Sequence, residues 1–452
     1  MKGKKLNTAL ISIVLISITI NFFIPIIFNF KAFNSFENSE KINSVASNQG
    51  YINTDNYEIF WFIHVSDLHV TTTDSLESFN YLLNETFMEI NPLLIVNTGD
   101  LVDSNLGSSL NVNEWLKYEN ILNNTGMNSS VYVDLIGNHD VSLNPNYEYF
   151  LNYSITGNTY NATQISFNKS FSFGDYAFIG LDTTKNTSYN FIEFGHFGFL
   201  NTKEMDWYEG ELEKYKNCDR IFVFGHHPIN RSNYLLFSDL TSSGKSLIEL
   251  NEEYNVFCYF CGHSHDTFFQ KSNGLLHVET KNFDNDEGVY RIVAVDNNQL
   301  STSVEEVGVW PQGIITYPPR EEYIVESLGN LNKIRVLAWD PLGLESVEWC
   351  VYNQFNSRIT DWKPLFNTGI NNPLWEGNWP SNLNDGNNYF IKVKITGASG
   401  TVIKELNFTF QKNLFVLYIA MIFIVSTFFS VSIIFSYYVI VREIKLEKNK
   451  WR

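Results

Sequence analysis

The fold is decided by the stretch VYVDLIGNHD, which runs from Val131 to Asp140. It begins as a short apolar strand, breaks at Gly137 and ends with three polar side chains in a row. Polar side chains that are buried without partners destabilise a fold, so these three are not packing residues. Open α/β sheets bind their ligands at the carboxyl ends of strands, so the stretch predicts part of a ligand site.

Four other predicted strands end in polar side chains in the same way. Residues 59–66 run into DLH at 67–69, and residues 93–98 run into GDLVD at 99–103. Residues 221–224 and 256–260 run into GHHP at 225–228 and GHSH at 262–265. The five strands would bring seven Asp, Asn and His side chains to one rim: Asp67, His69, Asp100, Asn138, His226, His263 and His265.

This ordered set of motifs resembles the signature of the calcineurin-like metallophosphoesterase superfamily. Each motif is short enough to occur by chance, but five in this order, each after an apolar strand, form a specific signal. The resemblance implies an α/β fold, a four-layer sandwich with two sheets. It also implies a hydrolase of phosphate esters that depends on metal ions.

The resemblance assigns a role to each polar side chain at the rim. One divalent metal ion would be held by Asp67, His69 and His265, and Asp100 would bridge it to a second ion. The second ion would be held by Asn138, His226 and His263. Mixed carboxylate, imidazole and amide ligands suit Zn, Mn or Fe. Two such ions would supply a hydroxide and neutralise the phosphoryl oxygens of a substrate.

Two further residues are predicted to act in catalysis. His139 would protonate the leaving oxygen, and by the family pattern Asp103 would hold the imidazole of His139 in orientation. Adjacent residues at a strand end point to opposite sides, so only one of His226 and His227 is a ligand. The family motif favours His226. His64 is interpreted as a buried strand histidine.

One departure from the family leaves the substrate open. Serine/threonine phosphoprotein phosphatases follow GDxVD with an Arg-Gly that clamps the phosphate, whereas Ser104 and Asn105 follow here. Diesters, monoesters and lipid headgroups therefore remain candidates. The flanking sequences FGHHP (224–228), YFCGH (259–263), YRIVA (290–294) and IRVL (334–337) resemble the membrane-bound branch called transmembrane protein 62.

The ends of the chain predict membrane attachment. Residues 1–30 combine basic residues with an apolar run, which predicts an N-terminal membrane anchor or, alternatively, a cleaved signal peptide. Residues 31–56 are predicted to be a linker. Residues 413–441 form a second apolar run, predicted to be a transmembrane helix, and residues 442–452 a cytosolic basic tail. Both termini would then be cytosolic, with a luminal or extracellular ectodomain, and the KNKWR ending makes the endoplasmic reticulum a candidate membrane.

Two domains are predicted between these ends. Residues 57–308 alternate strands with helical patterns, for example near 75–90 and 202–216, and form the predicted metallophosphoesterase domain. Regular short strands over 309–412 predict a small immunoglobulin-like β-sandwich, although the Cys…Trp…Cys pattern of true immunoglobulin domains is missing.

Composition limits the remaining possibilities. The net charge of −18 would repel the phosphate backbone of a nucleic acid, so nucleic acid is not an expected partner. Cys258 and Cys261 have the spacing of a redox or zinc pair but lie in a predicted strand, which favours buried thiols. Nine Asn-x-Ser/Thr sequons permit a glycoprotein without requiring one.

Two functions follow from the sequence. The favoured one is a membrane-anchored phosphoesterase with two metal ions, which hydrolyses a phosphate ester on the luminal or extracellular side. The alternative is a non-catalytic ectodomain that keeps the fold and its metals for binding or scaffolding. The intact set of seven predicted ligands, together with His139 and Asp103, favours the enzyme.

Overall fold

A computed structural model describes most of the chain. The described residues are 49–54, 57–103, 112–141, 146–184, 197–229, 236–272, 274–284, 288–319, 333–369, 372–379, 388–409 and 415–450. The predicted N-terminal anchor, most of the predicted linker and residues 104–105 lie outside them.

The first sheet carries three of the predicted motif strands. Its strand order is β14-β13-β2-β3-β4, with β1 paired to the outer part of β2. β2, β3 and β4 are parallel, whereas β13 runs antiparallel to β2. β2 is buried from Ile59 onward, as expected for a strand covered on both faces. The strands are β1 (Tyr51–Thr54), β2 (Tyr57–Val65), β3 (Ile95–Asn97), β4 (Tyr132–Asp134), β13 (Val289–Asp296) and β14 (Gln299–Glu306).

β1 corrects one prediction. Residues 31–56 were expected to be a linker, but Tyr51–Thr54 form a strand that pairs antiparallel with β2, with Tyr51 opposite Phe60. Ile52 is fully buried in this position. These four residues therefore belong to the sheet, because the unpaired edge of β2 offers them backbone partners.

The second sheet carries the other two motif strands. Its order is β11-β12-β10-β8-β6-β5, in which β6, β8, β10 and β12 are parallel and the two edge strands antiparallel. The strands are β5 (Ile165–Phe171), β6 (Gly174–Gly180), β8 (Arg220–Phe224), β10 (Cys258–Cys261), β11 (Phe268–Ser272) and β12 (Leu275–Glu279). A separate parallel ribbon joins β7 (Gly198–Leu200) to β9 (Leu236–Ser238).

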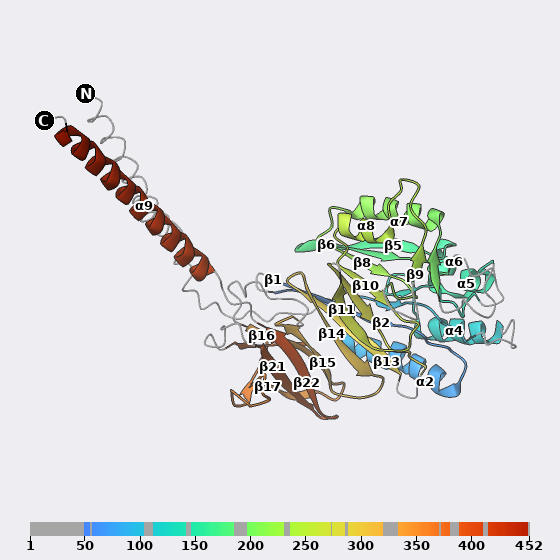
Figure 1. The fold of residues 1–452 in the computed structure, drawn as a ribbon. Coiled ribbons are helices and arrows are strands. Elements are labelled where there is room, and N and C mark those ends of the chain that lie inside the picture. The colour runs from blue at the N-terminus through green and yellow to red at the C-terminus, as the bar shows by residue number, and fades with distance from the viewer. Residues whose placement is uncertain are drawn as a thin grey trace. The chain divides into compact units, whose positions relative to one another are not determined.

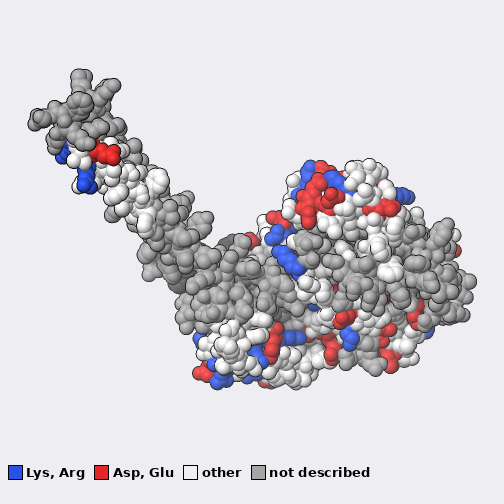
Figure 2. Space-filling model, in the orientation of Figure 1, with Lys and Arg blue, Asp and Glu red and all other residues white. Residues whose placement is uncertain are grey.

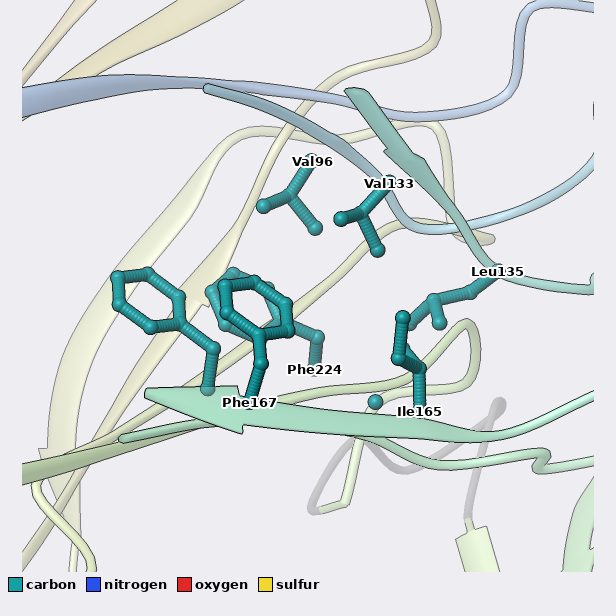
Figure 3. Close-up of a pocket in the computed structure, with 8 residues that line it drawn as sticks. Val96, Val133, Leu135, Ile165, Phe167 and Phe224 are labelled. Atoms are coloured by element: carbon teal, nitrogen blue, oxygen red, sulfur yellow. The ribbon is translucent and has the colours of Figure 1, made fainter. Parts of the chain in front are cut away.

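The two sheets pack face to face through an aromatic core. Phe62 of β2 meets the rings of Phe178, Phe222 and Phe224 across the interface, all at centroid distances near 6 Å and steep angles. Figure 3 shows a narrow apolar pocket in this layer, lined by Val96, Val133, Leu135, Ile165, Phe167, Phe178, Gly180 and Phe224. Because the core is rigid, it fixes the carboxyl ends of the two sets of strands relative to each other.

Helices cover the outer faces of both sheets (Figure 1). One set packs on the first sheet and α7 and α8 pack on the second, so the predicted four layers are present. The first set is α2 (Thr73–Tyr81), η1 (Leu82–Thr86, a π-helical turn), α3 (Phe87–Ile90), α4 (Val112–Thr125), α5 (Glu148–Tyr153) and α6 (Ile155–Tyr160); the second is α7 (Thr202–Tyr215) and α8 (Leu247–Glu253). Acidic side chains gather near α7 and α8 with lysines among them (Figure 2), for example Lys245 between Glu209 and Glu253.

The C-terminal strands form two antiparallel sheets of four strands each. Their orders are β15-β16-β20-β19 and β18-β17-β21-β22. Both contribute to one core that includes Trp349, Ile391 and Val336. The strands are β15 (Gln312–Tyr317), β16 (Lys333–Trp339), β17 (Leu344–Asn353), β18 (Lys363–Pro364), β19 (Phe366–Asn367), β20 (Leu374–Asn378), β21 (Asn388–Gly397) and β22 (Gly400–Thr409). This is a β-sandwich; its immunoglobulin-like character stays a prediction.

The sandwich packs on the first sheet as part of one compact unit. Arg335 of β16 is almost fully buried, and its guanidinium lies 2.8 Å from Asp296 of β13. Lys404 of β22 pairs with the buried carboxylate of Glu305 at 2.6 Å. The predicted boundary near residue 309 therefore separates two types of sheet but not two independently packed bodies.

Helix α9 (Phe415–Lys450) is a separate body. Within it, Ser426–Leu446 is the one described segment long and apolar enough to cross a membrane. The sequence predicted a span over 413–441 and a basic tail over 442–452. The helix continues through Lys450 and so includes most of the predicted tail.

Candidate metal centre

The predicted ligands sit on backbone that most residues avoid. Asp67, His69, Asp100, His263 and His265 all have positive φ, between 41° and 74°. Elsewhere among the described residues, positive φ occurs at glycines, six asparagines and Tyr147. Each such conformation costs about 1–3 kcal/mol and is typical of functional sites. Five of the seven predicted ligands are therefore held in strained backbone at the strand ends.

Two glycines let the motif loops approach each other. A Cβ on Gly137 would lie 2.1 Å from Oδ1 of Asp100, and a Cβ on Gly262 would lie 2.2 Å from Oδ2 of Asp67. Neither position has room for a side chain. These two glycines thus bring the loop after one strand against the carboxylate from another.

The first cluster joins Asp67, His69 and His265. Nε2 of His265 lies 3.4 Å from Oδ1 of Asp67, and Nε2 of His69 lies 4.0 Å from the same oxygen. One ligand atom from each residue falls within 4.8 Å of the others. His69 is buried, yet neither ring nitrogen has a hydrogen-bond partner within the described parts of the chain. A buried imidazole in this state fits a metal ligand, because burying it unpaired is unfavourable.

The second cluster centres on Nε2 of His226. This nitrogen lies 3.1 Å from Oδ2 of Asp100, 2.9 Å from Oδ1 of Asn138 and 3.2 Å from Nδ1 of His263. Nδ1 of His226 donates to the carbonyl of Thr98 at 3.0 Å. When His226 is neutral, its proton is on Nδ1 and its Nε2 keeps a lone pair, which is the arrangement a metal-binding histidine needs.

Asp100 lies between the two clusters. Its Oδ2 is 3.1 Å from His226 and 3.9 Å from Nε2 of His69. Burial alone would raise the pKa of Asp100, but the charge of His226 and other imidazoles outweighs burial and holds this pKa well below its usual value. For His226, burial opposes protonation, and the charge of Asp100 raises the pKa to about 9. Asp67 and Asp100 are thus two buried, ionised carboxylates beside a group of imidazoles. Their negative charge favours the binding of cations between them.

His139 and Asp103 meet at the solvent side of this cluster. Nδ1 of His139 donates to the carbonyl of Asp103 at 2.5 Å and lies 3.3 Å from its Oδ1. Nε2 of His139 therefore faces Asp100, at 3.9 Å, and the side chain is 35% exposed. Burial lowers the pKa of His139, but Asp100 and Asp103 outweigh it and raise the pKa to about 10. The hydrogen bond from His139 in turn lowers the pKa of Asp103.

Asp140 is a site residue to which the sequence assigned no role. Its Oδ1 accepts the backbone N–H of Leu101 at 2.9 Å and of Val102 at 3.2 Å, and its Oδ2 accepts that of Gly137 at 2.8 Å. Asp140 therefore joins the GDLVD loop to the GNHD loop. The signal was present, because Asp140 is the third polar residue of the stretch that defines the fold.

His227 takes a different environment from His226. Its Nδ1 lies 2.7 Å from the hydroxyl of Thr183, although its ring still lies beside that of His263. His227 also falls in a group with His226 and His263, but His226 is the residue that reaches Asp100 and Asn138. No sequence motif marked Thr183. Cys258 and Cys261 are both buried thiols that form no disulfide, as the sequence predicted.

Comparisons with known proteins agree with this arrangement. Residues 60–267 match the family model of the calcineurin-like phosphoesterases. Mouse transmembrane protein 62 is 29% identical over 321 residues, which cover 64% of this chain and 46% of that protein. An Arabidopsis thaliana protein with a metallophosphoesterase name is 28% identical over 230 residues, 47% of this chain and 30% of that protein. The chain thus spans less than half the length of both relatives.

Among solved structures, the Plasmodium protein GAP50, the anchor in the inner membrane complex, has a TM-score of 0.38 and 17% identity. That match covers 55% of this chain and 85% of that one. The match to the family model, and not this structural likeness, places a calcineurin-like phosphoesterase domain in residues 60–267.

Proposed function

We propose that this protein is a membrane-anchored phosphoesterase that uses two divalent metal ions. The observation that carries the proposal is the convergence of seven predicted ligands from two sheets. Among the described residues, the buried His69 has no hydrogen-bond partner for either ring nitrogen. Asp67, His69 and His265 would hold one ion; Asn138, His226 and His263 would hold the other; and Asp100 would serve both. Zn, Mn or Fe suits this donor set.

Bound at these clusters, two such ions would neutralise phosphoryl oxygens and lower the pKa of a bound water, which supplies hydroxide at neutral pH. The remaining chemistry belongs to the side chains. His139 carries a proton on Nδ1, held by Asp103, so its Nε2–H is the proton that can pass to a leaving oxygen. Because His139 is partly exposed, solvent can return that proton after each turnover.

The electrostatics support a general acid rather than a third ligand at His139. Asp103 and Asp100 both stabilise the charged imidazolium, as the raised pKa of His139 shows. Cations bound at Asp100 would cancel much of that effect and bring the pKa of His139 down toward the neutral range. A general acid works best when its pKa lies near the operating pH.

We further propose that α9 crosses a membrane and that the phosphoesterase domain works on the luminal or extracellular side. The apolar segment Ser426–Leu446 supports this, together with the basic residues at the end of the helix. With residues 1–30 as a second membrane anchor, both termini are cytosolic, and the sequons on the phosphoesterase domain are available to glycosylation.

A direct test uses the full chain purified in detergent. Metal analysis should find two divalent ions per chain, and hydrolysis of aryl phosphodiesters and monoesters should distinguish the substrate class. Asp100→Asn should abolish both hydrolysis and stoichiometric metal binding, while Asp206→Asn, on α7 and bonded to Ser242, should alter neither. Two bound ions without hydrolysis of any phosphate ester would favour the non-catalytic scaffold instead.

A further inference from the structure

Arg291 of β13 is a buried cation paired with the strand that leads to the candidate ligand Asp67. It is fully inaccessible to solvent and lies opposite His64 in the antiparallel pair formed by β13 and β2. Its Nη2 donates to the carbonyl of Glu279 at 2.7 Å and its Nη1 to the hydroxyl of Thr302 at 2.9 Å. An apolar side chain would fill the same space without desolvating a charge, so stability alone does not explain an arginine here.

From Arg291, a chain of hydrogen bonds runs to His64. Nε of Arg291 donates to Oγ1 of Thr280 at 3.1 Å, and the same hydroxyl lies 2.7 Å from Nδ1 of His64. Arginine can only donate. Thr280 Oγ1 has no third polar partner within the described residues, so its single proton points to Nδ1 of His64.

This fixes the tautomer of His64 and continues the chain. With Nδ1 as an acceptor, neutral His64 carries its proton on Nε2, which donates to Oγ1 of Thr98 at 3.0 Å. Burial and the charge of Arg291 hold the pKa of His64 well below its usual value, in agreement with a neutral ring. Thr98 is the residue whose carbonyl accepts the Nδ1–H of His226.

We propose that Arg291, Thr280 and His64 form a positioning relay that holds Thr98, and through it His226, in the orientation needed to bind metal. The relay begins on β13, crosses to Thr280 at the end of β12 in the second sheet, and returns to β2 and the end of β3 in the first. It therefore ties together the two sheets whose strand ends supply the ligands. The proposal rests on the proposed two-metal site and assigns residues that touch neither metal nor substrate.

The test measures metal affinity of the full chain in detergent, with Mn²⁺ and a competing chelator. Thr280→Val removes the hydroxyl while keeping the shape, and should weaken the binding of one ion, at most by the roughly 10–100-fold that follows loss of a direct partner of a ligand. Thr280→Ser restores the hydroxyl and should bind both ions as the wild type does. His64→Phe breaks the relay in its middle and should match Thr280→Val.

Thr316→Val is the matched control. Thr316 is also fully buried, and its hydroxyl donates to Asp296 at 2.9 Å, away from the metal centre. It should lose stability without losing metal affinity. The ion that Thr280→Val weakens should be the one lost in Asn138→Ala, and the ion that depends on His69 should remain.

Each result is decisive for the relay. Wild-type affinity in Thr280→Val and His64→Phe would overturn it. Weakening of the His69-dependent ion instead would also overturn it, as would the absence of any cooperative melting transition in both variants, because the residues would then serve the fold alone. A wild-type chain that binds fewer than two ions would refute the proposed function and leave no site for the relay to position.

Discussion

His139→Ala is expected to lower turnover while leaving the metal clusters intact. The backbone N–H of His139 donates to Oδ1 of Asp100 at 2.9 Å. This is the contact that matters for the fold, and it is kept in His139→Ala. The imidazole itself is 35% exposed and packs mainly on the ring of His69 at a centroid distance of 4.7 Å. Metal content should therefore match the wild type, and the melting temperature should change little.

The size of the loss follows from the role of the ring. A positioned general acid contributes about 10²–10⁴ in rate, which corresponds to roughly 2.7–5.4 kcal/mol of transition-state stabilisation. The full loss should appear with alkyl phosphate esters, because an alkoxide must be protonated as it leaves. With a nitrophenyl ester the loss should shrink, since nitrophenolate leaves without a proton.

The pH dependence supplies a second readout. A general acid is active when protonated, so wild-type turnover should fall as pH rises through the pKa of His139. That pKa is about 10 without bound ions, and cations bound at Asp100 should place the fall below this value. In His139→Ala this alkaline limb should disappear.

The assay compares kcat for alkyl and nitrophenyl phosphodiesters in the wild type, His139→Ala, Asp103→Asn and Asn138→Ala. Asp103→Asn should fall between the wild type and His139→Ala, because His139 remains but loses the partner that stabilises its charged form. Asn138→Ala should lose one ion. Full activity of His139→Ala on alkyl esters, beside an inactive Asn138→Ala, would refute the assignment of the acid.

Four further outcomes are expected. Asp140→Asn places an amide donor against the N–H of Gly137 and should lower the free energy of unfolding by about 2 kcal/mol, measured by denaturant titration. Gly137→Ala forces a Cβ to within 2.1 Å of Asp100 and should cost at least about 1–3 kcal/mol and reduce the number of bound ions. Arg335→Met leaves Asp296 buried without its cation and should cost about 3–5 kcal/mol, much of which Asp296→Asn in the same chain should restore; equal stability of single and double variants would contradict this. Endoglycosidase treatment should increase the gel mobility of the chain expressed in cells, and no change would count against a luminal ectodomain.

The strands that carry the motifs could be predicted because they are buried on both faces. Such strands are continuous apolar runs, and the polar residues that end them stand out sharply, as at Gly137 to Asp140. Long amphipathic helices such as Thr202–Tyr215 could be predicted from the helical spacing of their apolar residues. The ligand set came from family resemblance and stays a prediction, although the structure brings these side chains together.

Other features left no trace that a single sequence can show. α5 and α6 have six residues each, too few for a helical period to be recognised. β1 follows a polar segment and is a strand only because β2 offers it an edge. The pairs Arg335–Asp296 and Lys404–Glu305 join residues far apart in the sequence, so the packing of the sandwich on the first sheet could not be foreseen.

The strained backbone explains why the site needs supporting residues. Five ligands with positive φ, at about 1–3 kcal/mol each, together cost about as much as the net stability of a typical domain, 5–15 kcal/mol. Short motif loops cannot hold such conformations alone. Asp140 ties two of these loops through three backbone N–H groups, and His64 with Thr280 and Arg291 braces the end of β3 from below. These buried polar residues are thus needed for the site as the ligands are, because they hold the strand ends in the geometry that the ligands require.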